Sequence, residues 1–176
     1  LLKLIDTNQI DYKTLYGSWA GAFGFFQFMP STIKNHAIDY NNDDHIDLKN
    51  PNDAYASAAN YLNNMGWKKN SHCFYKVDLD DKISKKYLNV SAKKLINKKK
   101  LRYFKKFIKN HENLDFIDET LKVAIITPDK DIVPEAETLS PAYIVFDNYE
   151  IILKWNRSLR FALAVCTLKN KIQNVL

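Results

Sequence analysis

Residues 17–31, GSWAGAFGFFQFMPS, constrain the fold more than any other stretch of this chain. They hold three of its four glycines, at 17, 21 and 24, together with five aromatic residues and no charge. Residues without bulk let backbone segments approach closely, and aromatic rings need a surface to pack on. Ser18 and Gln27 are polar side chains inside this apolar setting. Taken alone, the pattern favours an ordinary core with Ser18 capping a helix; the alternative is the floor of a ligand groove.

Length and composition indicate a globular protein. The 176 residues are 46% hydrophobic and 26% charged, which suits one domain with elaborations or one interrupted by a small subdomain. No apolar run approaches the ~18 residues of a membrane-spanning helix. The chain starts with Leu1 and shows no signal peptide, so we expect it to be truncated or processed at its front.

The net charge of +6 is concentrated in residues 93–109, where nine of seventeen residues are basic. Leu101, Phe104 and Ile108 fall on one face of a predicted helix there, and the lysines are expected to form the solvent-exposed face of that helix. Arginine occurs only three times, which weighs against bidentate phosphate recognition. We therefore expect no nucleic-acid partner, and a cationic surface that favours an anionic polymer or membrane.

The chain divides into three parts, at 1–72, 73–140 and 141–176. Proline start signals predict helices over 30–38 and 51–67, the second with a buried face at 55, 58, 59 and 62. The run KVAIIT predicts a strand at 122–127, and two β runs are expected around DNYE at 147–150. A last, buried helix should start near 156 or 158. The class is α+β, with a helical core and a small mixed β subdomain at 73–140.

Two cysteines are too few for a disulfide framework. Cys166 stands in FALAVCTL, which favours a buried small hydrophobic residue; a single bridge with Cys73 is the alternative.

A possible metal loop follows the first predicted helix, in DYNNDDHIDLKNPND. Asp39, Asn41 and Asp43 occupy positions 1, 3 and 5, where short oxygen-bearing side chains can converge on one hard cation. The backbone carbonyl of His45 at position 7 adds a fourth oxygen, and Asp53 at the start of the next helix can close the set. The spacing indicates an EF-hand-type calcium loop.

Two positions depart from the EF-hand pattern. Position 12 is Asn50 where a glutamate is expected, and position 6 is Asp44 where glycine is usual. Aspartate tolerates the left-handed conformation at some cost, and Asp47 at position 9 would ligate through water. A solvated acidic turn is the alternative.

Three blocks in this order resemble one family: GSWAGAFGFFQFMPST, then AIDYNNDDHIDLKNPNDAYASAANYLNNMGW, then YEIILKWNRSLRFALAV. Together, residues 17–67 and about 141–168 resemble the membrane-bound lytic murein transglycosylase B family. The lysine-rich segment has no clear counterpart. The resemblance implies a lysozyme-like helical core, an EF-hand-type calcium site with the five ligands above, and a small β subdomain inserted late.

The resemblance also implies an activity. Members cleave peptidoglycan between N-acetylmuramic acid and N-acetylglucosamine without water, leaving a 1,6-anhydromuramoyl end. The resemblance places Ser18 beside the catalytic acid and implies that Gln27 hydrogen-bonds to the glycan. Trp155 and Asn156 match an aromatic–Asn pair that lines the groove, and Phe161 matches a second aromatic position. With the resemblance, the groove interpretation of residues 17–31 is favoured over the core.

The family's catalytic glutamate lies upstream of the glycine-rich block, and residues 1–16 contain none; the first glutamate is Glu112. Asp6 and Asp11 precede the block without matching that position. We therefore expect the chain alone to be inactive, as a split-gene product or fragment that pairs with an N-terminal segment carrying the glutamate. A glycan-binding remnant and a calcium-stabilised structural module are the alternatives. The expected substrate implies a periplasmic site of action, with an outer-membrane anchor in a missing N-terminal part.

Overall fold

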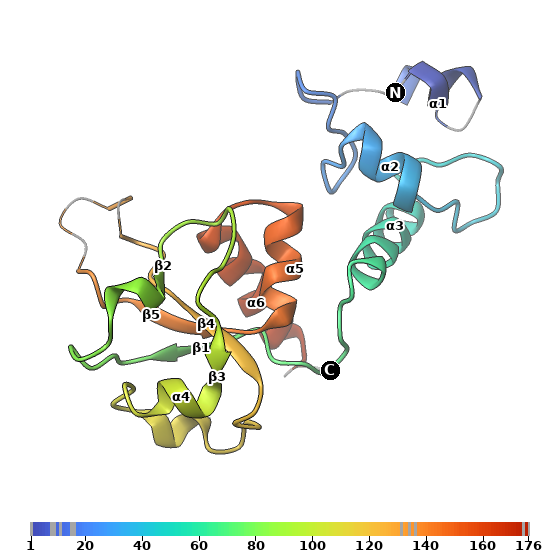
Figure 1. Ribbon diagram of the computed structural model, residues 1–176. Coiled ribbons are helices and arrows are strands. Elements are labelled where there is room, and N and C mark those ends of the chain that lie inside the picture. Colours follow the sequence, from blue (N-terminus) through green and yellow to red (C-terminus); the bar gives the residue numbers. More distant parts are fainter. Residues whose placement is uncertain are drawn as a thin grey trace. The chain divides into compact units, whose positions relative to one another are not determined.

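The computed structural model describes residues 2–7, 10, 12–14, 17–130, 132–133, 135, 137–173 and 175 (Figure 1). The chain forms two compact units, Leu1–Trp67 and Lys68–Leu176. The boundary expected near residue 72 lies shortly after the start of the second unit, and the boundary expected at 140 lies within it. Asp11 lies outside the described residues.

The first unit is helical, with α1 at Leu2–Asp6, a 3-10 turn at Tyr12–Thr14, α2 at Pro30–His36 and α3 at Pro51–Asn64. Both helices predicted from proline start signals are confirmed. The first turn of α3 is capped by the side chain of Asn50, which accepts a hydrogen bond from the Asn52 amide at 3.0 Å.

The buried face of α3 differs from the predicted one. Residues 54, 57, 58 and 61 are buried, whereas Tyr55 is 63% exposed. Ser57 accepts a hydrogen bond from the Ile38 amide at 2.9 Å, so a polar contact with the chain after α2 helps set the rotation of the helix. Hydrophobic periodicity misses this because it counts serine as a surface residue.

The second unit contains a mixed five-stranded sheet with strands β1 (Phe74–Val77), β2 (Leu88–Asn89), β3 (Lys99–Lys100), β4 (Lys122–Ile126) and β5 (Ala142–Val145). The order is β1-β5-β4-β2, with β3 also paired to β4. Only the β2–β4 pair is parallel among the described strands. The predicted strand KVAIIT is confirmed as β4. Its residues 123–126 are all buried, as expected of a strand covered on both faces.

One face of this sheet is covered by the lysine-rich segment. Leu101 and Phe104 of α4 (Leu101–Lys105) are fully buried, and Ile108 just beyond it is 3% exposed. They belong to a core cluster with Val123 and Ile125 of β4. The predicted apolar face is therefore confirmed.

Helices α5 (Asp147–Trp155) and α6 (Leu159–Gln173) lie side by side on the other side of the strands (Figure 1). The first β run around DNYE is confirmed as β5, but the second is wrong, because those residues form α5. A continuous apolar run fits a buried strand or a buried helix equally well. Asp147 and Glu150 in the first turn favour the helix, because carboxylates stabilise its positive end.

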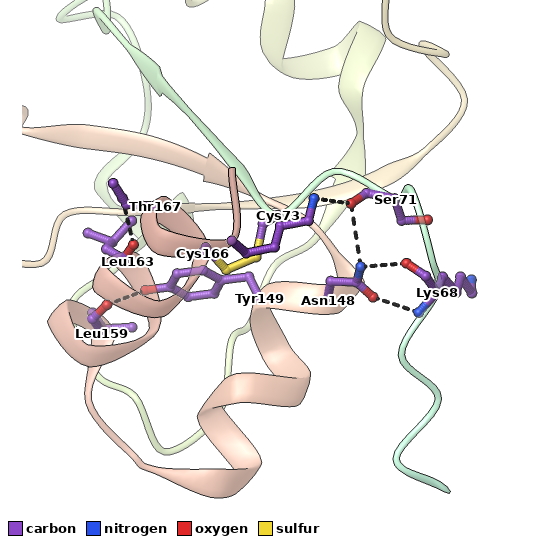
Figure 2. The surroundings of a disulfide bond; sticks show 10 residues. Lys68, Ser71, Cys73, Asn148, Tyr149, Leu159, Leu163, Cys166 and Thr167 are labelled. Atoms are coloured by element: carbon purple, nitrogen blue, oxygen red, sulfur yellow. Dashed lines mark hydrogen bonds between the residues drawn. A yellow bond between two sulfur atoms is a disulfide. The ribbon is translucent and has the colours of Figure 1, made fainter. Parts of the chain in front are cut away.

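A disulfide joins Cys73, just before β1, to Cys166 in α6 (Figure 2). The expectation of an unpaired Cys166 was therefore wrong, although the residue is fully buried as predicted. The two residues are 93 positions apart, and their Cα atoms lie 6.0 Å from each other. Among the described residues, no helix combines the length and apolar character needed to cross a membrane.

Candidate functional site

The glycine-rich block folds as two tight turns rather than a helix. Phe23 forms antiparallel bridges with Gly17 and with Phe28. At Gly24, with φ +78°, an added Cβ would lie 2.5 Å from the Leu48 Cβ and 2.8 Å from its carbonyl oxygen. The next amide, that of Phe25, donates to this carbonyl at 2.9 Å. Glycine is thus required at 24 because the block packs directly on the segment that precedes α3.

Four of the five aromatic rings of the block divide into two groups. Phe23 and Phe28 are 2% and 3% exposed, and Phe28 packs against Tyr61 of α3 with ring centroids 6.0 Å apart. Burial raises the pKa of the Tyr61 hydroxyl. Trp19 is fully exposed and Phe25 is 55% exposed. The core interpretation therefore describes Phe23 and Phe28, whereas a groove at the exposed Trp19 and Phe25 stays a prediction.

Ser18 and Gln27 lie in consecutive turns of this block, and both are exposed. The Ser18 hydroxyl oxygen accepts the Ala22 amide at 3.1 Å, which leaves its own hydrogen available to donate. The Gln27 side-chain nitrogen donates to the Gly24 carbonyl at 2.9 Å. Gln27 also has φ +50°, a conformation that residues other than glycine seldom adopt.

The other three predicted glycan residues gather around the turn between α5 and α6 in the second unit. Trp155 ends α5 and is half-buried, whereas Asn156 is the exposed C-cap residue. Phe161, 38% exposed, lies in the first turn of α6. Ser158 caps that helix by accepting the Phe161 amide at 3.2 Å, which confirms the predicted helix start.

The predicted metal loop is closed on itself by its own side chains. Asp39 accepts the Asp43 and Asp44 amides, at 3.3 and 2.9 Å. The side-chain oxygen of Asn41 accepts the same Asp43 amide at 3.3 Å, and Asp43 accepts the His45 amide at 3.0 Å. Oxygens from positions 1 and 3 therefore meet at one point inside the loop. Asp44 adopts the left-handed conformation expected at position 6, with φ +67°.

Asp53 ties both ends of the loop to α3. It is completely buried, and its two carboxylate oxygens accept the Tyr40 and Asp47 amides, each at 2.9 Å. Each oxygen retains a further lone pair for a ligand. In the described part of the chain, no three His, Cys, Asp or Glu side chains form a ready metal-binding group. A cation here would also need Asn41 and the His45 carbonyl, so the residues present fit calcium, an oxygen-seeking ion, better than a transition metal.

A buried asparagine that could not be identified from the sequence organises the second unit. Asn148 of α5 is fully buried and binds both the amide and the carbonyl of Lys68, at 3.0 and 2.8 Å (Figure 2). It also donates to the Ser71 carbonyl at 3.4 Å. The signal available in the sequence was a polar residue next to the apolar run YEIIL, in the DNYE stretch expected between two β runs.

Comparisons with known proteins agree with this architecture. The profile of the family described as Transglycosylase SLT domain (SLT_2) matches residues 1–170. Membrane-bound lytic murein transglycosylase B of Escherichia coli (strain K12) is 51% identical over 68 residues, which make up 39% of this chain and 19% of that protein.

Two solved structures extend the likeness over nearly the whole chain. SltB3 of Pseudomonas aeruginosa, crystallised with NAG-anhNAM-pentapeptide, is 28% identical with a TM-score of 0.82, covering 98% of this chain and 44% of that one. Slt35 of Escherichia coli, solved with calcium, is 24% identical with a TM-score of 0.72, covering 99% and 51%. This chain thus has a lysozyme-like lytic transglycosylase fold and spans about half the length of these solved relatives. The chain therefore belongs to the transglycosylase SLT domain family, in agreement with its resemblance to lytic murein transglycosylase B.

Proposed function

We propose that this chain is the C-terminal part of a peptidoglycan lytic transglycosylase. The parent enzyme cleaves the bond between N-acetylmuramic acid and N-acetylglucosamine without water and leaves a 1,6-anhydromuramoyl product. The observation that supports this most directly is the family match over residues 1–170. The likeness to SltB3, whose crystal contained an anhydromuramoyl peptide, points to the same class of substrate.

The glycan-binding role falls to five residues. Gln27 presents its amide from a strained left-handed position, and strain of this kind concentrates at functional sites. Ser18 has a hydroxyl hydrogen to give, and Trp155 and Phe161 offer apolar surface to the face of a pyranose ring. Asn156, exposed at the end of α5, can hydrogen-bond to an acetamido or hydroxyl group.

The general acid is proposed to lie on another segment. Residues 1–16 contain no glutamate, and neither Asp6 nor Asp11 matches the position of the family's acid, so the neutral carboxylic acid that this cleavage needs is not assigned to these residues. Loss of a general acid alone lowers the rate by ~10²–10⁴-fold. A polypeptide of these 176 residues should therefore bind glycan without cleaving it, and an N-terminal partner segment should supply the acid.

Digestion of purified sacculi with mass spectrometry of the products tests this proposal. The 176-residue chain alone should release no 1,6-anhydromuropeptides. Fusing it to a relative's glutamate-bearing segment should produce them, and the same fusion with that glutamate changed to glutamine is the matched control. Anhydro products from the unfused chain would contradict the assignment, and Asp6→Asn would then be the first variant to examine.

A glycan-binding module without catalysis is the second candidate. The exposed Trp19 and Phe25 favour it, because aromatic surface binds sugar faces whether or not an acid is present. An inactive fusion that still binds peptidoglycan strands would support this candidate over the enzyme.

Calcium is the proposed structural ion, held by the side chains of Asp39, Asn41, Asp43 and Asp53 and by the His45 carbonyl. It would fix the loop between α2 and α3, on which the glycine-rich block packs through Leu48. The proposed site of action is the periplasm, where peptidoglycan lies, with any membrane anchor in another part of the protein. In this proposal residues 73–140 are an insertion in the helical core.

A further inference from the structure

A cavity of about 430 Å³ lies in the second unit, between residues 92–98 and the C-terminal end of α5. Leu95 and Leu153, each 7% exposed, contribute apolar wall to it. The charged residues that line it are five cations and one acid: Lys93, Lys94, Lys98, Lys154, Arg157 and Glu150. The cavity therefore combines an apolar wall with a strongly cationic rim.

The positive charge of this cavity is largely uncompensated. Lys98 forms an ion pair with Glu150, and both side chains are about 30% exposed. The other four cations make no ion pair with any residue that the structure describes. Uncompensated cations around a concave surface attract anions, because low-dielectric walls focus the field. The chemistry of the cavity thus selects an anionic ligand with a short apolar portion.

The position of the cavity indicates which anion this is. Lys154 and Arg157 directly flank Trp155 and Asn156, to which the proposed function assigns the glycan. In peptidoglycan, the muramoyl sugar carries a short peptide with several free carboxylate groups. A sugar held at Trp155 and Asn156 would bring that peptide within reach of the neighbouring cations.

We propose that this cavity binds carboxylates of the peptidoglycan stem peptide, an inference that rests on the proposed function. A discrete carboxylate on an alkyl chain fits a hollow with apolar walls, whereas a flat lipid surface contacts protruding residues. Four of the five cations are lysines, which act as compact point charges and do not require one fixed carboxylate geometry. The cavity therefore favours peptide-bearing strands over bare glycan.

Binding of two matched ligands to the 176-residue chain tests the proposal: muropeptides that keep their stem peptides, and glycan chains from which an amidase has removed them. Lys154→Gln/Arg157→Gln and Lys93→Gln/Lys94→Gln neutralise the two sides of the cavity separately. Each pair should weaken binding of the peptide-bearing ligand by roughly threefold to tenfold, as expected for two partly exposed charge pairs. Affinity for bare glycan should not change. The control, Lys76→Gln/Lys82→Gln, removes the same charge from exposed positions outside the cavity lining.

The outcomes separate this proposal from the proposed function. If the wild-type chain binds neither ligand, the proposed function fails. If it binds both equally, or if the control pair weakens binding as much as the cavity pairs, the proposed function stands and the stem-peptide site is overturned. If the cavity variants instead lose binding to phosphatidylglycerol vesicles while keeping their preference for muropeptide, the cavity is a lipid contact. Unchanged circular dichroism and melting temperature show that each variant is folded.

Discussion

Removing the Cys73–Cys166 disulfide should strongly destabilise the second unit. The bridge joins residues 93 positions apart, and both cysteines are buried. Alanine is the suitable replacement at both sites, because a serine hydroxyl there would be buried without a hydrogen-bond partner. The perturbation is therefore the double variant Cys73→Ala/Cys166→Ala, compared with the oxidised wild type.

The expected magnitude follows from loop closure in the unfolded chain. A cross-link across ~94 residues lowers the unfolded-state entropy enough to contribute about 4 to 5 kcal/mol, and native disulfides typically contribute 2–5 kcal/mol. The folded segment before β1 should stay in place, because Asn148 binds Lys68 and Ser71 (Figure 2). Lys169 also donates to the Ser71 carbonyl at 3.4 Å. The loss should therefore come mainly from the unfolded state. Small domains have only ~5–15 kcal/mol of stability, so the effect is large.

Urea unfolding monitored by circular dichroism measures the difference. The double variant should lose about 3 to 5 kcal/mol of unfolding free energy relative to oxidised wild type. Dithiothreitol should lower the unfolding free energy of the wild type towards that of the variant, and it should leave the unfolding free energy of the variant unchanged. Thiol titration of the denatured wild type, without reductant, should find no free thiol. Two free thiols after oxidative refolding, or equal stability of variant and oxidised wild type, would refute the reasoning.

The remaining predictions concern calcium, the glycan site and pH. Calcium at 100 times its dissociation constant should add about 2.7 kcal/mol of stability, seen as a higher melting temperature, and Asp43→Ala should abolish the rise; indifference to calcium and chelator would contradict the site. Gln27→Ala and Asn156→Ala should each weaken chitooligosaccharide binding, measured by calorimetry, by ~1 kcal/mol with little effect on folding; unchanged binding with easier unfolding would make them structural residues. Burial, followed by repulsion from Lys169, lowers the pKa of His72, so the folded state binds protons less readily than the unfolded chain. Unfolding free energy should therefore fall as pH drops through about 6.5 towards the lower folded value, and a urea series from about pH 7 to 5 should be flatter for His72→Gln; identical slopes would show that His72 does not contribute.

Local signals were sufficient where a short segment determines its own structure. Pro30 and Pro51 predicted the starts of α2 and α3, because the fixed φ of proline acts within one helical turn. The alternate oxygens of Asp39 and Asn41 predicted a loop whose side chains converge on a cation, and in the structure both oxygens accept the Asp43 amide. Whether that loop holds calcium stays a prediction.

The sequence by itself determined the family, through motifs read residue by residue. It also determined the starts of the main helices and the central strand, because these depend mostly on residues close along the chain. Only the tertiary structure decided that the run after DNYE is helical, that Tyr55 faces outward, and that Cys166 pairs with Cys73. A buried apolar run satisfies either secondary structure until its neighbours are known. Likewise, two cysteines 93 residues apart can pair only when folding brings α6 beside the start of β1, and no local pattern encodes that distance.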